Sequence, residues 1–276
     1  MNPLQNLDKK IEEHVSQLAQ ETDDLKKSVF FREYLDTMAK FWRYSYHNQL
    51  LIHVQFRNAS RVAGFRKWNE LGRKVLKGSK AIKILAPFAK KVKEKDFTTG
   101  EEKEVSRTYF WPVNVFDVSQ TEGRELPKLD LDVNGDDEQG LLDRLLKSCE
   151  TQDIEVEFKE LGVNGLYGYS RGGKIVIGSS QSANTKVNTL IHEIAHELTH
   201  YSAEGKKFSK TEKEIQAEAT VYVISKILGF ESKSPNYLAF YASDKNRILE
   251  SLETISNTVK KILDFETKKE MGVVSE

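Results

Sequence analysis

The 276-residue chain lacks several features that would narrow its class. Its single cysteine, Cys149, excludes an internal disulfide and any cysteine-rich zinc module. No apolar run is long enough to span a bilayer, and the polar N-terminal stretch 1–20 holds no apolar core of a secretory signal. The sequence therefore predicts a cytoplasmic protein with no membrane partner. The length allows one large or two modest domains, and a hydrophobic content of 38% is enough for buried cores.

A net charge is also missing, because 42 Lys and Arg residues balance 42 Asp and Glu residues. This balance hides an asymmetry along the chain. Between residues 43 and 95, fourteen basic residues face two glutamates, so this segment carries +12 and the rest of the chain carries −12. Such a local field attracts polyanions, above all nucleic acid. The composition thus favours a basic domain joined to an acidic one.

The spacing of apolar residues divides the chain into two α+β domains. In the first, it predicts helices over 11–19, 29–41, 46–56 and 65–71. Runs of β-branched and aromatic residues then predict strands over 81–87, 88–92 and 105–118, the last two forming a hairpin. Further on, the pattern predicts a helix over 141–149, strands over 154–158, 166–169 and 174–177, and helices over 185–201, 210–228 and 245–265. The acidic, aperiodic stretch between the two parts gives the expected limits: domain 1–125, linker 126–140 and domain 141–276.

The most specific motif is the stretch 192–196, which reads HEIAH. Two histidines four residues apart share one face of a helix, so the imidazoles of His192 and His196 can reach one zinc ion per chain. Glu193 is then placed to act as general base on the water that the zinc activates. The apolar residues of this helix gather on the opposite arc, so the motif would face a cleft. The alternative is a solvated helix face that happens to hold two histidines.

A zinc site needs a third protein ligand. His200 lies too far along the same helix to share one ion with the two histidines, so it is expected in the cleft wall or behind the ligands. Glu218 is the better candidate, because it interrupts the otherwise apolar stretch 215–224, where a carboxylate is costly to bury unless it is paired. Glu214, one turn earlier, is expected to orient a ligand from behind. The alternative is a solvated acidic edge.

Three distinctive stretches lie in the N-terminal domain: YSYHNQLLI (44–52), AGFRKWNELGRKVLKGSKAIKILAP (63–87) and VFDVSQTEG (115–123). Through them the domain resembles that of the antirestriction ArdC family. This resemblance implies a bacterial, mobile-element setting and sequence-tolerant binding of single-stranded DNA, which cations and stacking aromatic rings would hold. The alternative is that the aromatic residues form a core under solvated lysines. The candidate nucleic-acid-binding residues are Tyr44, Tyr46, Asn48, Arg66, Lys67, Trp68, Arg73, Lys74, Lys77 and Lys80.

The second domain holds, in this order, the strand KIVIG (174–178), the helix with TLIHEIAH (189–196) and the later AEA (217–219). In this pattern it resembles the ImmA/IrrE-type zincin-like metallopeptidases. This resemblance implies that His192, His196 and Glu218 bind zinc and that Glu193 is catalytic. For the residue that stabilises the oxyanion, Tyr201, Tyr222 and His200 all stay open. ArdC proteins join these two kinds of domain in the same order.

Three hypotheses follow from these motifs. The first is a zinc metalloendopeptidase that binds single-stranded DNA and cleaves an unknown protein substrate on or near it, with antirestriction as its biological role. The second is a protein that binds and protects single-stranded DNA without catalysis, with a structural or vestigial zinc site. The third is a peptidase regulator whose basic domain binds RNA or an acidic protein.

Overall fold

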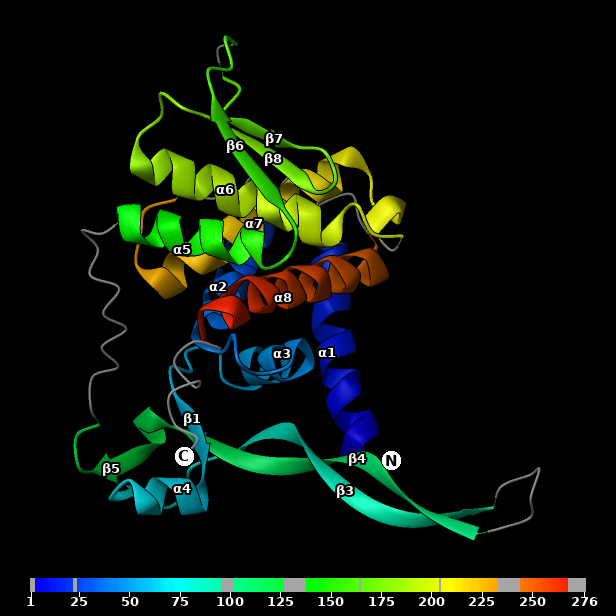
Figure 1. Ribbon diagram of the computed structural model, residues 1–276. Coiled ribbons are helices and arrows are strands. Elements are labelled where there is room, and N and C mark those ends of the chain that lie inside the picture. The colour runs from blue at the N-terminus through cyan, green and yellow to red at the C-terminus, as the bar shows by residue number, and fades with distance from the viewer. Residues whose placement is uncertain are drawn as a thin grey trace, which may run out of the picture. The chain divides into compact units, whose positions relative to one another are not determined.

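The computed structural model describes residues 3–21, 24–95, 102–126, 138–163, 165–203, 205–232 and 244–267 (Figure 1). The chain forms two compact units, Met1–His14 with His47–Pro127 and Val15–Tyr46 with Lys128–Glu276. Helices combine with small sheets in the chain, which confirms the predicted α+β class. The second unit takes in residues 15–46, which the sequence had placed in the first domain. Most of the expected linker 126–140 lies outside the described residues, so the domain limits stay a prediction.

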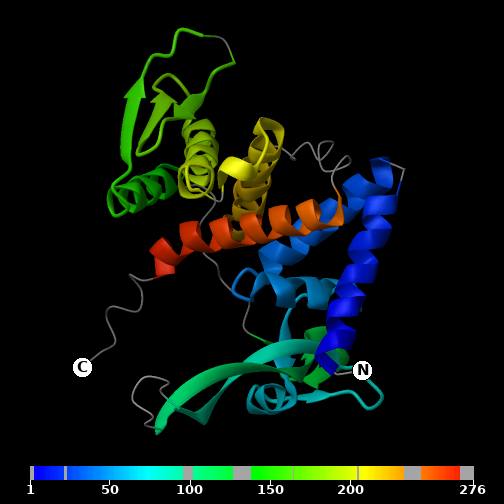
Figure 2. The ribbon, with the colours of Figure 1, turned by 90° about the vertical axis from the view of Figure 1, so that its right-hand side faces the viewer.

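The first unit is built around a three-stranded sheet of order β1-β4-β3. Its elements are α3 (Tyr46–Gln55), β1 (Val62–Gly64), α4 (Phe65–Glu70), β2 (Arg73–Val75), β3 (Ile82–Lys95), β4 (Glu102–Asp117), the 3-10 turn η1 (Val118–Gln120) and β5 (Thr121–Gly123). Helix α1 (Pro3–Gln20) begins in this unit. β3 and β4 run side by side as a long curved ribbon (Figure 2). The predicted antiparallel pairing of 88–92 with the strand over 105–118 is confirmed.

The predicted break between residues 87 and 88 is wrong, because β3 continues through Pro87. The reason lies at the outer edge of β3. There the side-chain amide of Asn48 bonds both backbone groups of Leu85, donating to its oxygen at 2.9 Å and accepting from its nitrogen at 2.8 Å. Gln55 does the same for Lys83. By the two-residue period of a strand, position 87 also points its nitrogen to this edge, so the N–H that proline lacks is not needed by the sheet.

Asp117 closes the base of this sheet. Its carboxylate is 1% exposed and accepts hydrogen bonds from the backbone nitrogens of Ser60 (2.7 Å), Arg61 (3.0 Å) and Ser119 (2.9 Å). Burial by itself raises the pKa of Asp117, but these hydrogen bonds outweigh it and hold the pKa below its ordinary value. The ionised carboxylate therefore stabilises the fold.

Replacing Asp117 by asparagine is expected to lower the free energy of unfolding by about 1–3 kcal/mol, because buried backbone N–H groups lose an acceptor. A folded-state pKa below the unfolded one gives stability that is present above the ordinary pKa of aspartate and is lost as the pH falls through the folded value. The difference between parent and variant should therefore shrink on acidification in that range. Urea unfolding at several pH values measures it, and equal midpoints at neutral pH would contradict this role.

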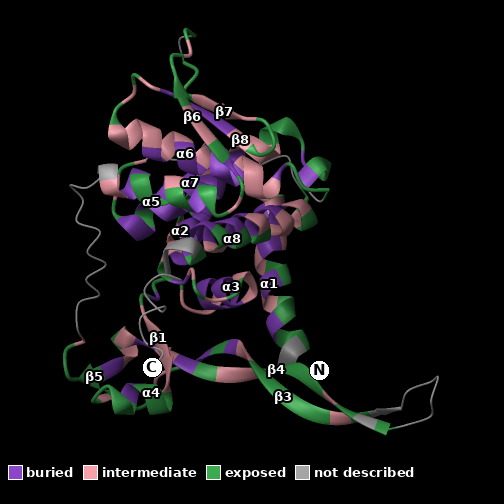
Figure 3. Ribbon diagram, in the orientation of Figure 1, coloured by how far each residue is buried: buried purple, intermediate pink, exposed green. Residues whose placement is uncertain are grey.

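The second unit packs helices against a sheet of order β6-β8-β7. Its elements are α2 (Asp24–Lys40), α5 (Glu138–Glu150), β6 (Glu155–Lys159), β7 (Gly168–Ser170), β8 (Lys174–Gly178), α6 (Ala183–Thr199), the 3-10 turn η2 (Gly205–Lys207), α7 (Lys210–Leu228) and α8 (Lys245–Thr267). α7 contacts α2, α6 and α8, and most of its residues are buried (Figure 3). None of the described helices is long and apolar enough to cross a membrane.

Candidate metal centre

Helix α6 presents the HEIAH motif to a cavity. Its N-terminus is capped by Ser182, whose hydroxyl accepts from the nitrogen of Thr185 at 3.2 Å. Its apolar residues Val187, Leu190, Ile191 and Ile194 are buried in the core. The opposite face carries His192, Glu193 and His196, which line a cavity of about 1140 Å³. The helix thus has the orientation that its amphipathic pattern predicts.

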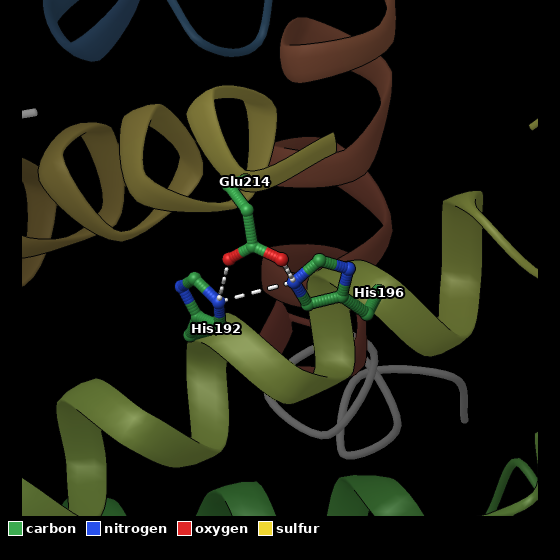
Figure 4. Close-up of side chains that lie close together, drawn as sticks. All are labelled: His192, His196 and Glu214. Atoms are coloured by element: carbon green, nitrogen blue, oxygen red, sulfur yellow. Dashed lines mark hydrogen bonds and ion pairs between the residues drawn. The ribbon is translucent and has the colours of Figure 1, made fainter. Parts of the chain in front are cut away.

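Two histidines of α6 and one glutamate of α7 converge in this cavity (Figure 4). The Nε2 atoms of His192 and His196 lie 3.0 Å apart, and the carboxylate oxygens of Glu214 lie 3.3 Å and 3.7 Å from them, respectively. Ligand atoms in a tetrahedral zinc site, each about 2.0 Å from the ion, are about 3.3 Å from one another. The spacing and donor set of this cluster therefore fit a divalent metal.

The glutamate in the cluster is Glu214, where the sequence had favoured Glu218. Glu218 lies one helical turn later on α7, lines the same cavity and acts electrostatically on His192. Which of two carboxylates on one helix face meets the histidines depends on how α6 and α7 are packed, which local spacing does not determine. The positions expected for the two glutamates are thus reversed: Glu214 lies among the candidate ligand atoms, and Glu218 lies beside them.

In this cluster, the carboxylate and the imidazoles each stabilise the charged form of the other. Hydrogen bonds from His192 and His196 hold the pKa of Glu214 far below its ordinary value. Burial lowers the pKa of His192, but the hydrogen bond with Glu214 and the negative charges of Glu193, Glu214 and Glu218 together outweigh it and raise the pKa overall. Glu214 is therefore ionised at neutral pH, as a metal-binding carboxylate must be.

Glu193 is held beside the cluster in a different environment. Its side chain is buried, and burial raises its pKa although His192 and His196 act in the opposite sense. Strand β7 passes close to it at Gly168, where a Cβ atom would lie 2.6 Å from Thr189 Cγ2 and 2.8 Å from the oxygen of Val176. A carboxylate whose pKa is raised toward neutrality suits a general base.

A chain of hydrogen bonds runs from His196 into the core. Nδ1 of His196 lies 2.8 Å from Nδ1 of His200, Nε2 of His200 lies 2.9 Å from Oε1 of Gln216, and Nε2 of Gln216 donates to Ser251 at 3.0 Å. Burial lowers the pKa of His200 to about 4, so its ring is neutral. Because the side-chain oxygen of Gln216 faces His200, a neutral His200 donates from Nε2 to Gln216 and accepts at Nδ1 from His196. A neutral His196 that donates from Nδ1 has a lone pair on Nε2, which can bind a metal in place of the hydrogen bond to Glu214.

Replacing Gln216 by leucine is accordingly expected to weaken metal affinity by about 10- to 100-fold, because the proton on His200 loses its acceptor. Gln216→Glu keeps an acceptor and should retain most of the affinity. Competition with a chelator measures both variants. Equal affinity in the parent and the leucine variant would show that Gln216 does not position His196.

Of the three candidates for the oxyanion-stabilising residue, Tyr201 lines the cavity. Its hydroxyl donates to the oxygen of Ser170 at 2.6 Å. The hydroxyl of Tyr222 instead bonds Asp36 at 2.9 Å, and burial raises the pKa of Tyr222 to about 12. His200 belongs to the hydrogen-bond chain behind His196. The geometry therefore favours Tyr201 among the three.

Two residues near the site are not among those that the sequence analysis predicts. Glu197, next to His196, accepts from the backbone nitrogens of Gly172 (2.8 Å) and Gly173 (2.6 Å), which fixes the turn between β7 and β8 to α6. Gln216 is 2% exposed and could have been noticed as a polar residue in the apolar run 215–224. Its role depends on a contact with α6 that the sequence does not show.

The predicted nucleic-acid-binding residues fall into three groups. Two are part of the core: Trp68 is 2% exposed and its Nε1 donates to the oxygen of Phe116, while Asn48 bonds the edge of β3. A stacking or contact role for these two is not supported, because neither offers surface to a base. The second group is Arg73 alone, whose guanidinium donates to the hydroxyl and to the backbone oxygen of Thr121 and so binds β5.

The other seven retain surface. Tyr44 and Tyr46 are half-buried and belong to the second unit, and burial raises the pKa of both. The remaining five are exposed cations of the first unit, and Lys67 among them pairs with Glu70 at 3.2 Å. Their contact with nucleic acid stays a prediction. These five are Arg66, Lys67, Lys74, Lys77 and Lys80.

Two known domain families match separate stretches of the chain. Residues 4–116 match the N-terminal domain of the anti-restriction factor ArdC, and residues 149–224 match the IrrE N-terminal-like domain of the M78 peptidase family. The uncharacterized protein pXO2-81 of Bacillus anthracis is 26% identical in an alignment 293 positions long, and this alignment covers 86% of this chain and 49% of that protein. The chain thus spans about half the length of this curated relative.

Two crystal structures are also similar to the chain. They are those of the antirestriction ArdC protein from the R388 plasmid, in a metal-free and a Mn(II)-bound form, with TM-scores of 0.48 and 0.47. The identities are 20% and 18%, and the alignments cover 82% and 81% of this chain and 86% and 85% of theirs.

Proposed function

The chain is ArdC-like, with an ArdC-type N-terminal domain followed by an IrrE-like M78 domain, and from this premise we propose that it is a zinc metalloendopeptidase that cleaves proteins bound on or near single-stranded DNA. One observation carries the proposal: Glu193 lies in the same cavity as the His192, His196 and Glu214 cluster. A metal site with a buried carboxylate beside it provides the two parts that metal-assisted peptide hydrolysis requires.

We assign His192, His196 and Glu214 as the protein ligands of one zinc ion. The mutual distances of their donor atoms support this choice over Glu218. Glu218 is then a neighbouring carboxylate whose negative charge raises the pKa of His192. Two imidazoles and one carboxylate leave a fourth position open, which is the arrangement of catalytic zinc sites.

The chemistry divides between the ion and the chain. A bound zinc ion supplies Lewis acidity, which lowers the pKa of a water molecule and polarises the carbonyl of the scissile peptide bond. Glu193 accepts the proton of the attacking water and delivers it to the leaving nitrogen. Tyr201 lines the cavity, and its hydroxyl would donate to the developing oxyanion after releasing its hydrogen bond to the oxygen of Ser170.

The edge of β7 provides a place for an extended substrate. Tyr167 and Arg171 bond their backbone groups to β8, since Gly178 donates to the oxygen of Tyr167 and Arg171 donates to the oxygen of Lys174, both at 2.9 Å. By the alternation of a strand, the backbone groups of Gly168 and Ser170 face the other way. Both residues line the cavity with Glu193, so a peptide added along this edge, in exchange for the bond from Tyr201 to the oxygen of Ser170, would reach the base.

The DNA part of the proposal rests on the basic first unit and on its match to the ArdC N-terminal domain. Exposed cations such as Lys74, Lys77 and Lys80 can bind phosphates without reading a sequence. Antirestriction is the biological role that this match favours. Cleavage near DNA would then follow from docking one unit on the strand while the other acts on a bound protein.

Hydrolysis of dye-labelled casein, free and covalently linked to oligo-dT, tests the proposal in one experiment. The zinc-loaded chain should cleave both substrates and the linked one faster, since docking raises the local substrate concentration. A chelator should stop both reactions and added zinc should restore them. No cleavage of either substrate by the zinc-loaded chain would overturn the peptidase assignment.

A protective, non-catalytic protein is the second candidate. The observation that favours it is that the five exposed cations predicted to bind DNA lie in the first unit, whereas the metal cluster belongs to the second. Coating of single-stranded DNA would therefore need no metal chemistry. In that case the zinc site is structural or vestigial, and DNA protection persists after the site is emptied.

A further inference from the structure

The outer part of the β3–β4 ribbon has two faces of different chemistry. Residues of paired strands alternate between faces, so the pairs Ala86–Trp111, Phe88–Tyr109 and Lys90–Arg107 share one face. We call these six residues the ribbon platform. The pairs Pro87–Phe110, Lys91–Ser106 and Lys93–Glu104 share the opposite face.

The ribbon platform exposes three aromatic rings in a row. Trp111 is 58% exposed, Phe88 is 43% exposed and Tyr109 is 40% exposed. Phe88 and Tyr109 are stacked, with ring centroids 5.7 Å apart and planes inclined by 28°. Trp111 follows Tyr109 two residues along the same strand, about 7 Å away. Closer to the base of the ribbon, Ile82, Ile84 and Val115 continue the same face and are buried in the core. The aromatic rings therefore lie just where this face leaves the core.

The two faces also differ in charge. On the opposite face, Lys91 pairs with Glu104 at 3.6 Å and Lys93 pairs with Glu102 at 3.4 Å, so the lysines are balanced. On the ribbon platform, Lys90 lies directly across from Arg107. Two cations opposite each other on one face can both contact a single phosphate group.

We propose that the ribbon platform binds single-stranded nucleic acid, with unpaired bases stacking on Trp111 and on the Phe88–Tyr109 pair and with a phosphate between Lys90 and Arg107. This inference rests on the proposed binding of single-stranded DNA and assigns a surface to that binding. Aromatic rings beside a cationic pair match a strand whose bases are exposed, whereas a duplex offers its phosphates but keeps its bases stacked on one another. Stacking is tolerant of sequence, because every base has a π-face.

Binding of dye-labelled oligo-dT, followed by fluorescence anisotropy, tests the ribbon platform. Trp111→Ala and Tyr109→Ala should each raise the Kd by about 5- to 150-fold, the usual range for loss of one stacking ring. Phe110→Ala is the matched control, since Phe110 is 54% exposed but lies on the opposite face, and it should leave the Kd within about twofold. Trp111→Phe keeps a ring and should rescue most of the affinity, which separates stacking from a folding defect.

The possible failures are distinguishable. If the parent binds oligo-dT and neither alanine variant changes the Kd, the ribbon platform is not the binding surface, while the proposed DNA binding stands. If the parent does not bind oligo-dT at all, both fail. A duplex of equal length that binds as tightly as oligo-dT, with the same loss in Trp111→Ala, would overturn the preference for unpaired bases.

Discussion

Glu193→Gln is expected to lower the rate of peptide hydrolysis by about 10²- to 10⁴-fold while leaving the metal content and the fold unchanged, because the amide cannot accept a proton from water. Glu193 lies beside the ligand atoms of the cluster but is not one of them, so the site keeps its donor set. Hydrolysis of dye-labelled casein measures the rate, and elemental analysis of the same sample measures the zinc.

Glu160→Gln serves as the control for this change, since Glu160 is an exposed glutamate of the same unit. It should keep the parent rate. A Glu193→Gln variant that hydrolyses casein as fast as the parent would contradict the catalytic mechanism. The same variant also separates the two candidate functions, because a purely protective protein would retain full protection of single-stranded DNA.

The second large effect concerns salt-dependent DNA binding. Replacing Lys74, Lys77 and Lys80 together by glutamine should reduce the slope of log affinity against log salt by about 2, because each lost phosphate contact to a single strand contributes about 0.7. At 0.1 M salt this corresponds to about 10²-fold weaker binding of oligo-dT. Anisotropy titrations over a series of salt concentrations measure the slope.

The control for charge removes three exposed lysines from the second unit, Lys206, Lys226 and Lys261. Net charge changes by the same amount, yet the slope should stay that of the parent. An equal loss in both triple variants would mean that overall charge matters rather than this surface. An unchanged slope in the first variant would remove these lysines from the DNA contact.

The metal helix could be predicted because its information is local. The spacing of His192 and His196 and the apolar arc behind them lie within one helix, and α6 presents them as that spacing requires. The third ligand was harder, since Glu214 and Glu218 share a face of α7 and only the packing of α7 on α6 decides which one reaches the histidines. Periodicity within one helix carries no information on that packing.

The N-terminal surface shows a different limit. Composition shows that aromatic and basic residues are interleaved, but it does not tell which rings are buried. Trp68 lies in the core and Trp111 is largely exposed. The ArdC-like stretch predicts a nucleic-acid contact for Asn48, whereas its side chain pairs with the edge of β3. That contact joins residues 37 positions apart in the chain and has no local signature.

Metal content of the purified chain, measured by elemental analysis beside His196→Ala, Glu214→Ala and Glu218→Ala, tests the central claim most directly. The account predicts about one zinc per parent chain, lost in His196→Ala and Glu214→Ala and retained, with weaker affinity, in Glu218→Ala. Retention in Glu214→Ala together with loss in Glu218→Ala would return the third-ligand role to Glu218. A parent chain that holds no zinc even after loading would contradict the metal centre itself.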